Sequence, residues 1–304
     1  MNTNNIIKIE NITKKIIEPN FISGFTNADG SFMISISRVN TLKYKYRVTP
    51  LFVLTQMDRE LLDLINNHFN NKGHIILDKR SKCYYLRFNS IKNILTYIIP
   101  HFDKYPLRGK KLLDYEKWKY IIELMDKDKT HLSSMGIAQI AKLSLYSKNK
   151  SKLKQHVISN ISNELKKSIE DLPFKSKLID SDIIDPWYIT GMIQGDGSLY
   201  VHFPREHTNF ALAIESLVIL KDIKNYFNNI GHIYKINDTY YRYQIYKKDD
   251  IINILIPHLR KYPLYCIKGS DFEKLINFTV NSDATELEKA VIYNLSFNVE
   301  EKNV

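Results

Sequence analysis

Two aspartates in this 304-residue chain stand in matching contexts, because Asp29 and Asp196 are each followed by Gly and Ser. One Asp-Gly pair alone is most simply a helix cap or a turn. Two carboxylates brought close together would repel each other, and bound divalent cations relieve that repulsion. Hard cations such as Mg²⁺ prefer oxygen ligands and also hold phosphate groups. If the fold brings both aspartates together, the pair predicts a metal-dependent site for phosphodiester hydrolysis.

The two aspartates belong to an internal repeat. Three blocks recur in the same order, which indicates a duplicated domain. The second copy is shorter just after its first block, so we expect a shorter hairpin there than in residues 32–50. The matching blocks are Pro19–Phe32 with Pro186–Leu199, Phe69–Ile75 with Phe227–Ile233, and Ile99–Leu107 with Ile256–Leu264.

Each copy is predicted to begin with a short helix. Asp185 is a good N-cap, and Pro186 suits the first helical position, where a missing N–H costs nothing. This helix should run to about Gly195, with Gly197 ending it in a left-handed conformation. The first copy should do the same over residues 19–30.

Small residues recur four positions apart in both helices: Gly24 and Ala28 in the first, Gly191 and Gly195 in the second. A face without bulk lets two helix backbones approach closely. One such residue alone is most simply explained by local packing, but a matched face on both copies favours pairing of the two helices. The motif aspartates would then lie close together at the paired helix ends.

Alternating strands are expected after each helix. Phe32, Ile34 and Ile36 alternate with serines, which predicts a sheet with one face on the core and one polar, basic face. A ribbon of strands can enter the major groove of DNA, although an ordinary solvated sheet face is the alternative. The side chains expected to contact DNA are Ser35, Ser37, Arg38, Lys43, Lys45, Arg47, Arg87, Tyr200, His202, Arg242 and Gln244.

The expected fold class is α+β, with two pseudo-symmetric αββαββα domains that form a saddle of antiparallel sheets around the paired helices. The remaining helices are expected at 59–69, 91–99, 112–124, 218–227, 251–256 and 272–278. We expect the first domain over residues 1–146 and the second over 186–304. Residues 147–185 are rich in Lys, Ser and Asn and predict a linker that is partly helical.

Composition narrows the function classes. The formal net charge is +11, which favours a polyanionic partner. Cys83 and Cys266 have no metal-ligand neighbour at short spacing, so a zinc knuckle is excluded and a disulfide framework is not indicated. No apolar run is long enough to span a membrane, and the N-terminus is typical of neither a secretory nor an import signal.

The motifs Ile22–Gly30 and Ile189–Gly197 resemble the two motifs of single-chain LAGLIDADG homing endonucleases of the group I intron-encoded type. The resemblance covers most of the chain, including the Lys-Tyr-Pro-Leu blocks and residues 136–140. It implies a saddle of two four-stranded sheets over double-stranded DNA, in a protein that works as a monomer.

The same resemblance implies roles for individual residues. Catalytic divalent metals would be bound by Asp29 and Asp196 with the backbone carbonyls of Ala28 and Gly195. The metal would be Mg²⁺ or another divalent cation such as Mn²⁺, and Ca²⁺ would occupy the sites without supporting cleavage. A basic residue beside each scissile phosphate is implied at Lys111 and Lys268, whose alternative is a solvated helix lysine. A polar residue that organises active-site water is implied at Gln56.

Position 214 departs from this pattern, because the repeat partner of Gln56 is Ile214. The second half would then use Glu215 or Ser216, or leave that water to the other side. Symmetric cleavage of the two strands is therefore in doubt.

Two other functions are consistent with the sequence. One is an intron maturase, an RNA-binding splicing factor on the same scaffold that acts on its own intron RNA. The other is a non-catalytic basic binding protein, which would bind no metal at the motif aspartates. The use of Asn, Ile, Lys and Tyr fits an AT-rich coding genome and predicts a mitochondrial, organelle-encoded protein.

Overall fold

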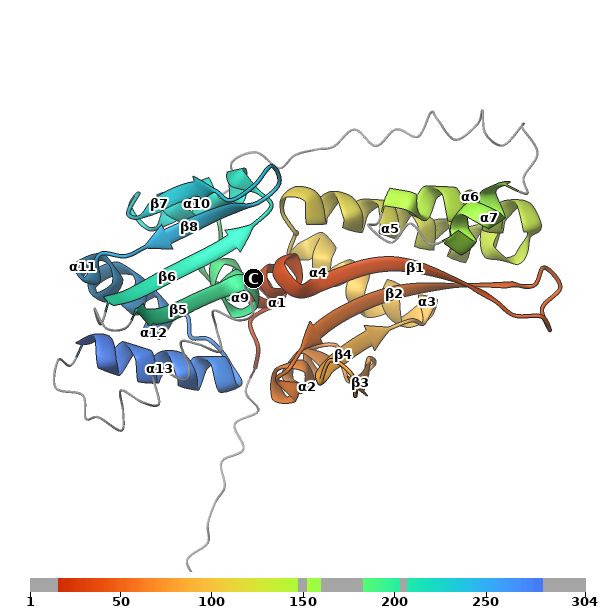
Figure 1. Cartoon of the computed structure of the whole chain (residues 1–304). Coiled ribbons are helices and arrows are strands. Elements are labelled where there is room, and N and C mark those ends of the chain that lie inside the picture. Colours follow the sequence, from red (N-terminus) through yellow and green to blue (C-terminus); the bar gives the residue numbers. More distant parts are fainter. Residues whose placement is uncertain (1–15, 147–151, 160–182, 203–206, 281–304) are drawn as a thin grey trace, which may run out of the picture.

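The computed structural model describes residues 16–146, 152–159, 183–202 and 207–280. Two similar halves lie on either side of a central pair of helices (Figure 1). Each half contains a four-stranded antiparallel sheet, with strand order β1-β2-β4-β3 in the first and β5-β6-β8-β7 in the second. The predicted α+β class and the αββαββα order are confirmed.

The first half begins with the motif helix α1 and ends with the long helix α5, after which further helices lie on the same side. Its elements are α1 (Pro19–Asp29), β1 (Gly30–Arg38), β2 (Tyr46–Gln56), α2 (Arg59–His68), β3 (His74–Asp78), β4 (Cys83–Phe88), α3 (Ile91–Asn93), the π-helix η1 (Ile94–Ile98), α4 (Ile99–Lys104), α5 (Gly109–Lys127), η2 (Thr130–Leu132), α6 (Ser134–Leu143), η3 (Ser144–Tyr146) and α7 (Lys152–Ser159).

The second half repeats this order with shorter strands. Its elements are α9 (Pro186–Asp196), β5 (Gly197–His202), β6 (His207–Ile214), α10 (Leu217–Tyr226), β7 (His232–Lys235), β8 (Tyr241–Ile245), α11 (Lys248–Asp250), the π-helix η4 (Ile251–Leu255), α12 (Ile256–Lys261) and α13 (Cys266–Val280). The predicted difference in hairpin length is confirmed: β1 and β2 have 9 and 11 residues, and β5 and β6 have 6 and 8.

The predicted helix start at Asp185 is also confirmed. The Asp185 carboxylate accepts hydrogen bonds from the backbone N–H groups of Trp187 and Tyr188, at 2.8 and 3.3 Å. The expected end of the helix is wrong in one respect. Gly197 is extended, with φ −78° and ψ 146°, because it is already the first residue of a strand. Glycine is needed there for space, since a Cβ would lie 2.6 Å from the carbonyl oxygen of Ile193.

The continuous helix expected over residues 91–99 is interrupted by a π-turn, η1, in which the Ile99 N–H donates to the Ile94 carbonyl. Pro100 follows directly and has no N–H to donate, so a shift of hydrogen-bond register just before it is tolerated. The equivalent turn, η4, precedes Pro257 in the second half. Of the predicted linker, the described part is α7, which packs on α6, with residues 183–185 before α9; residues 147–151 and 160–182 lie outside the described residues.

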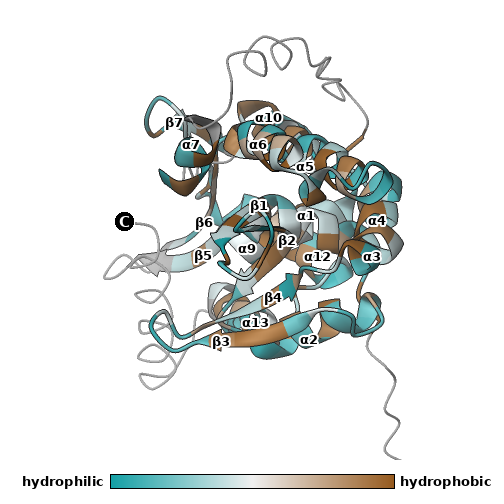
Figure 2. Ribbon diagram, turned by 90° about the vertical axis from the view of Figure 1, so that its right-hand side faces the viewer, coloured by the Kyte–Doolittle hydropathy of each residue, from teal (hydrophilic) through white to brown (hydrophobic). Residues whose placement is uncertain are grey.

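Each sheet packs one face against helices to form a core. In the first half, the rings of Phe32, Phe52, Phe102 and Trp118 meet at centroid distances of 5.1–5.5 Å. Hydrophilic and hydrophobic segments alternate along helices such as α2 and α5, as expected for helices with one buried face (Figure 2). The predicted inward residues of β1 are buried, whereas Ser35 and Ser37 are exposed.

Candidate active site

The two motif helices pack against each other through their glycines, as predicted. A Cβ on Gly24 would lie 2.0 Å from the Tyr188 carbonyl oxygen, and one on Gly191 would lie 2.1 Å from the Phe21 carbonyl oxygen. These distances are far below any real contact, so the glycines permit a backbone-to-backbone approach. The pairing fixes the two helix ends relative to each other.

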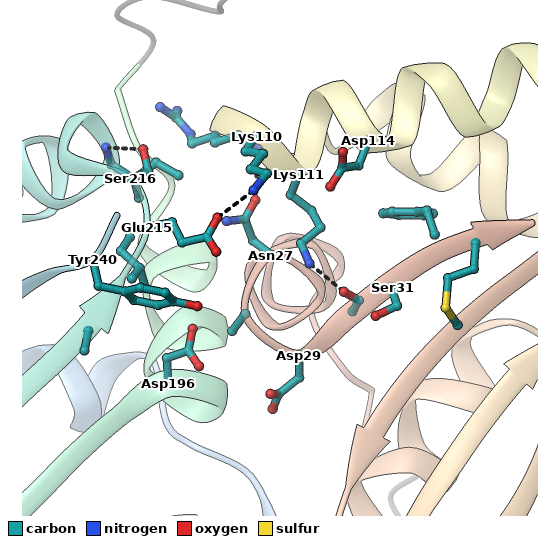
Figure 3. Close-up of a pocket in the computed structure, with 18 residues that line it drawn as sticks. Asn27, Asp29, Ser31, Lys110, Lys111, Asp114, Asp196, Glu215, Ser216 and Tyr240 are labelled. Atoms are coloured by element: carbon teal, nitrogen blue, oxygen red, sulfur yellow. Dashed lines mark hydrogen bonds and ion pairs between the residues drawn. The ribbon is translucent and has the colours of Figure 1, made fainter. Parts of the chain in front are cut away.

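Asp29 and Asp196 are the last residues of α1 and α9. Both line one cavity of about 490 Å³ at the junction of the halves, and Figure 3 shows each at the end of its helix. A Cβ on Gly195 would lie 3.2 Å from an Asp29 carboxylate oxygen, so Asp29 is next to the end of α9. The predicted meeting of the two aspartates at one site is therefore supported by the geometry.

Burial raises the pKa of Asp196 to about 6, and the charges of Lys268 and Lys111 oppose that shift. The negative ends of two helix dipoles also point toward this region, which disfavours an added negative charge. A carboxylate in these surroundings is stabilised by a bound cation. No group of three His, Cys, Asp or Glu side chains that could hold a metal occurs among the described residues. A divalent ion here would need backbone carbonyl, phosphate or water oxygens besides the two carboxylates.

The two lysines predicted beside the aspartates occupy equivalent positions. The Lys111 ammonium donates to the carbonyl oxygen of Gly30, and the Lys268 ammonium donates to that of Gly197, both at 2.5 Å. Each lysine is therefore held at the residue that follows a motif aspartate. Burial lowers the pKa of Lys111, and the charges of four acids, Asp114, Asp196, Asp29 and Glu215, oppose this shift. The alternative of freely solvated lysines does not fit these contacts.

Two amide side chains connect the helices that carry Lys111 and Lys268, α5 and α13, to the motif helices. They were not singled out in the sequence analysis. The Asn27 side-chain oxygen accepts from the Arg108 N–H at 3.2 Å and from the Tyr188 hydroxyl at 2.8 Å. At the equivalent place, the Gln194 side-chain oxygen accepts from the Tyr265 N–H at 3.0 Å. Arg108 and Tyr265 each stand three residues before a site lysine. An amide two residues before each motif aspartate was the sequence signal for this contact.

Further polar residues line the cavity beside Lys111. Glu215 forms an ion pair with Lys110 at 2.9 Å. Asp114 lies on the helix of Lys111, and Tyr240 lies across the cavity beside Glu215 and Asp196 (Figure 3). Burial raises the pKa of Asp114. Glu215 and Ser216, the two residues considered as replacements for a polar side chain at position 214, both line the cavity. The Ser216 hydroxyl already caps α10, because it accepts from the Ile219 N–H.

Gln56 is not among the residues that line this cavity. Its side-chain oxygen accepts from the Met57 N–H at 2.8 Å. Ile214 lines the cavity and is buried. The structure thus brings Asp29, Asp196 and Lys111 to one cavity, whereas neither Gln56 nor Lys268 lines it.

The predicted DNA-contacting side chains differ in exposure. Ser35, Ser37, Arg38, Lys43, Lys45 and Arg47 are exposed, and Arg87, Arg242 and Gln244 are half-buried. Tyr200 is only 9% exposed. Burial of a large aromatic ring contributes to the stability of the fold, and the contact of Tyr200 with DNA stays a prediction. The side chain of His202 lies outside the described residues.

The paired motif helices, the two sheets and the matched Asp–Lys pairs define a protein class that comparison with known families identifies. A family model described as LAGLIDADG endonuclease matches residues 22–122 and 189–279, which is more than half of the chain. The chain belongs to the LAGLIDADG endonuclease family.

Similar proteins carry matching names. A probable intron-encoded endonuclease 2 of Neurospora crassa is 28% identical over 85% of this chain and 59% of its own length. A probable intron-encoded DNA endonuclease 1 of Mycosarcoma maydis is 28% identical over 79% of this chain and 91% of its own. The LAGLIDADG homing endonuclease I-GzeII, solved in complex with its DNA target, matches with a TM-score of 0.71 and 26% identity over 92% of this chain and 97% of that chain. The chain thus spans about three fifths of the Neurospora relative.

Proposed function

We propose that this chain is a homing endonuclease that cuts both strands of a long, pseudo-palindromic DNA site by metal-dependent hydrolysis. The observation that carries the proposal is the matched pair of acid and base at the junction of the halves. Asp29 with Lys111, and Asp196 with Lys268, occupy equivalent positions at the ends of the paired helices. A site with two equivalent halves suits a reaction on two antiparallel strands.

Each part of the site has a chemical role in this proposal. Asp29 and Asp196, with the carbonyl oxygens of Ala28 and Gly195, hold Mg²⁺ or Mn²⁺, and Ca²⁺ occupies the same place without supporting cleavage. When bound, the cations supply an activated water and stabilise the leaving oxygen. Lys111 and Lys268 neutralise the negative charge that develops on the phosphate as water attacks and one P–O bond breaks.

The polar, basic faces of the two sheets supply the DNA contacts in this proposal. Phosphate contacts from Arg and Lys fix the position of the protein, and side chains in the groove read the bases. The net charge of +11 and the DNA-bound relative support double-stranded DNA as the partner. One chain already contains both half-sites, so we propose a functional monomer.

We further propose a mitochondrial, organelle-encoded protein with its first domain over 1–146, a linker over 147–185 and its second domain over 186–304. The intron-encoded relatives and the composition support the location. Within the described residues, helices long and apolar enough to cross a membrane are absent.

The proposal is tested by selecting cleaved sites from a randomised DNA library with Mg²⁺ and then assaying variants on the selected site. Asp29→Asn and Asp196→Asn should bind this site but cut it about 100-fold more slowly or not at all, because each removes a carboxylate from the site. EDTA should stop cutting by the unaltered chain. Asp238→Asn is the control, since that side chain is 100% exposed. Unchanged cutting by both site variants, or cutting in EDTA, would contradict the proposal.

A further inference from the structure

The two half-sites are built from equivalent positions but carry unlike side chains. Gln56 pairs with Tyr84 at the end of β2, and Ile214 pairs with Tyr241 at the end of β6, so these two positions correspond. Two residues later, Asp58 and Ser216 are the N-caps of α2 and α10. The intervening residues, Met57 and Glu215, are therefore equivalent.

The end of β6 lies beside α5, the helix of Lys111, and the end of β2 lies beside α13, the helix of Lys268. Glu215 follows β6 and pairs with Lys110 at 2.9 Å, next to Lys111. In the other half-site, the carboxylate of Asp58 accepts from the Ile267 N–H at 2.9 Å, which places the end of β2 next to Lys268. Residues after β6 thus belong to the Lys111 half-site, and residues after β2 belong to the Lys268 half-site.

The side chains at these positions differ in chemistry. The Lys111 half-site has the ion pair of Lys110 with Glu215, and its neighbour at position 214 is the buried Ile214. The Lys268 half-site has Ile267 and Met57, which are apolar and 61% and 50% exposed, and a polar neighbour, Gln56.

Tyr240 strengthens this contrast. It stands directly before β8, at the place that Cys83, the first residue of β4, takes in the first half. Tyr240 is 36% exposed and lines the cavity together with Asp196 and Glu215. Figure 3 shows the Tyr240 ring between Glu215 and Asp196. A hydroxyl group and a carboxylate therefore both line the cavity that also contains Lys111.

We propose that Glu215 and Tyr240 supply, in the Lys111 half-site, the hydrogen-bonding groups for water that Gln56 supplies in the Lys268 half-site. The two DNA strands are then cut by different sets of residues. This inference rests on the proposed nuclease function and adds the residues that distinguish the two strand cleavages.

The geometry supports Glu215 in this role. Its side chain is 26% exposed, so it is partly desolvated and still reachable by water. The ion pair with Lys110 holds the carboxylate in place, and its charge also acts on Lys111. An ionised carboxylate has about four lone-pair sites, so Glu215 can accept from water as well as from Lys110.

The test measures the cleavage rate of each strand separately on a selected site whose two strands carry different labels. Glu215→Gln keeps the shape but weakens the acceptor, and Tyr240→Phe removes only the hydroxyl. Each should slow the same one strand about tenfold and the other less than twofold. Gln56→Leu should slow the opposite strand. Glu273→Gln, an exposed residue on α13, is the matched control and should change neither rate.

The ratio of the two strand rates separates this role from a structural one. One molecule cuts both strands, so a smaller folded fraction slows both equally and leaves the ratio unchanged. Equal slowing of both strands by Glu215→Gln, or slowing of the same strand by Gln56→Leu, would overturn the inference while leaving the nuclease function intact. Absence of any cutting by the unaltered chain would overturn both.

Discussion

At the residue scale, Asp196 lowers the stability of the fold at neutral and higher pH. Its folded pKa of about 6 lies above the usual 3.8. The folded state therefore holds its proton more tightly, and unfolding free energy is lost as pH rises from about 4 to about 6. Asp196→Asn should raise the free energy of unfolding at pH 8 by about 1–3 kcal/mol, while abolishing cutting.

Denaturant titrations at pH 8 and pH 4 check this prediction. The gain should shrink at pH 4, where the carboxyl is protonated in the folded state. Asp238→Asn should show little change at either pH, because its side chain is fully exposed. A variant at position 196 that is less stable than the unaltered chain at pH 8 would contradict the charge argument.

Two threonines of the motif helices should respond in opposite ways to the same change. The Thr26 hydroxyl is buried and has no hydrogen-bond partner among the described residues. The Thr190 hydroxyl donates to the Tyr262 carbonyl at 3.0 Å and lies 3.1 Å from a ring nitrogen of His258. Thr26→Val should therefore stabilise the fold by about 1 kcal/mol, and Thr190→Val should destabilise it by about 1–3 kcal/mol. Thermal unfolding measures both, and destabilisation by Thr26→Val would show that its hydroxyl has a role in the fold.

At the element scale, α1 and α9 approach each other so closely that Gly24 and Gly191 leave no space for a side chain. Gly191→Ala adds a methyl group that would lie 2.1 Å from the Phe21 carbonyl oxygen, so the helices must separate. In an isolated helix the same change is favourable by about 1 kcal/mol. We expect instead a loss of more than about 2 kcal/mol and loss of cutting, because the two aspartates move apart.

Ala28→Gly provides the matched control on the same interface, because it removes a methyl group where α1 faces Gly195. It should cost only the helix propensity of about 1 kcal/mol. Equal losses of stability for the two variants would indicate that close approach of the backbones is not what these glycines provide.

These elements also show which features a sequence can predict. Capping by Asp185, the small faces and the alternation in β1 are local patterns with one physical solution, so they were predicted correctly. The π-turns before Pro100 and Pro257 were missed, because a shift of hydrogen-bond register leaves no periodic signal. The left-handed end at Gly197 was wrong, because the next strand determines the backbone there.

The residues of the candidate site also divide into those that the sequence predicted and those that it did not. Asp29 and Asp196 lie in the repeated motif, so duplication made them visible, whereas Lys111 and Lys268 were implied by the family resemblance. Glu215 was one of two candidates that the sequence offered, Tyr240 was not predicted, and the packing of one half against the other brings both to the cavity of Lys111. Burial of Tyr200 likewise depends on tertiary packing that alternation along one strand does not contain.

At the scale of the whole molecule, the charge of +11 should make DNA binding depend steeply on salt. Each phosphate neutralised by a lysine or arginine adds a slope of about −0.9 in log K against log salt, because binding releases condensed counterions. Lys43 and Lys45 are exposed between β1 and β2, the strands of the longer hairpin. Replacing both with Gln should weaken binding to all sequences and make the slope shallower by roughly 0.9 for each phosphate that is no longer neutralised.

Lys127 and Lys129 are the matched control for this change. They are exposed at the end of α5, a helix that packs on the core side of β1 through the buried Trp118. Lys45 and Lys129 both have a positive φ, 58° and 50°, so each double variant places one Gln in a left-handed backbone conformation. Fluorescence anisotropy with Ca²⁺ over a range of KCl concentrations gives both slopes. A smaller slope for the Lys43/Lys45 variant alone supports DNA along the outer face of the sheet. If the two double variants have the same slope of log K against log salt, the DNA binds on another surface.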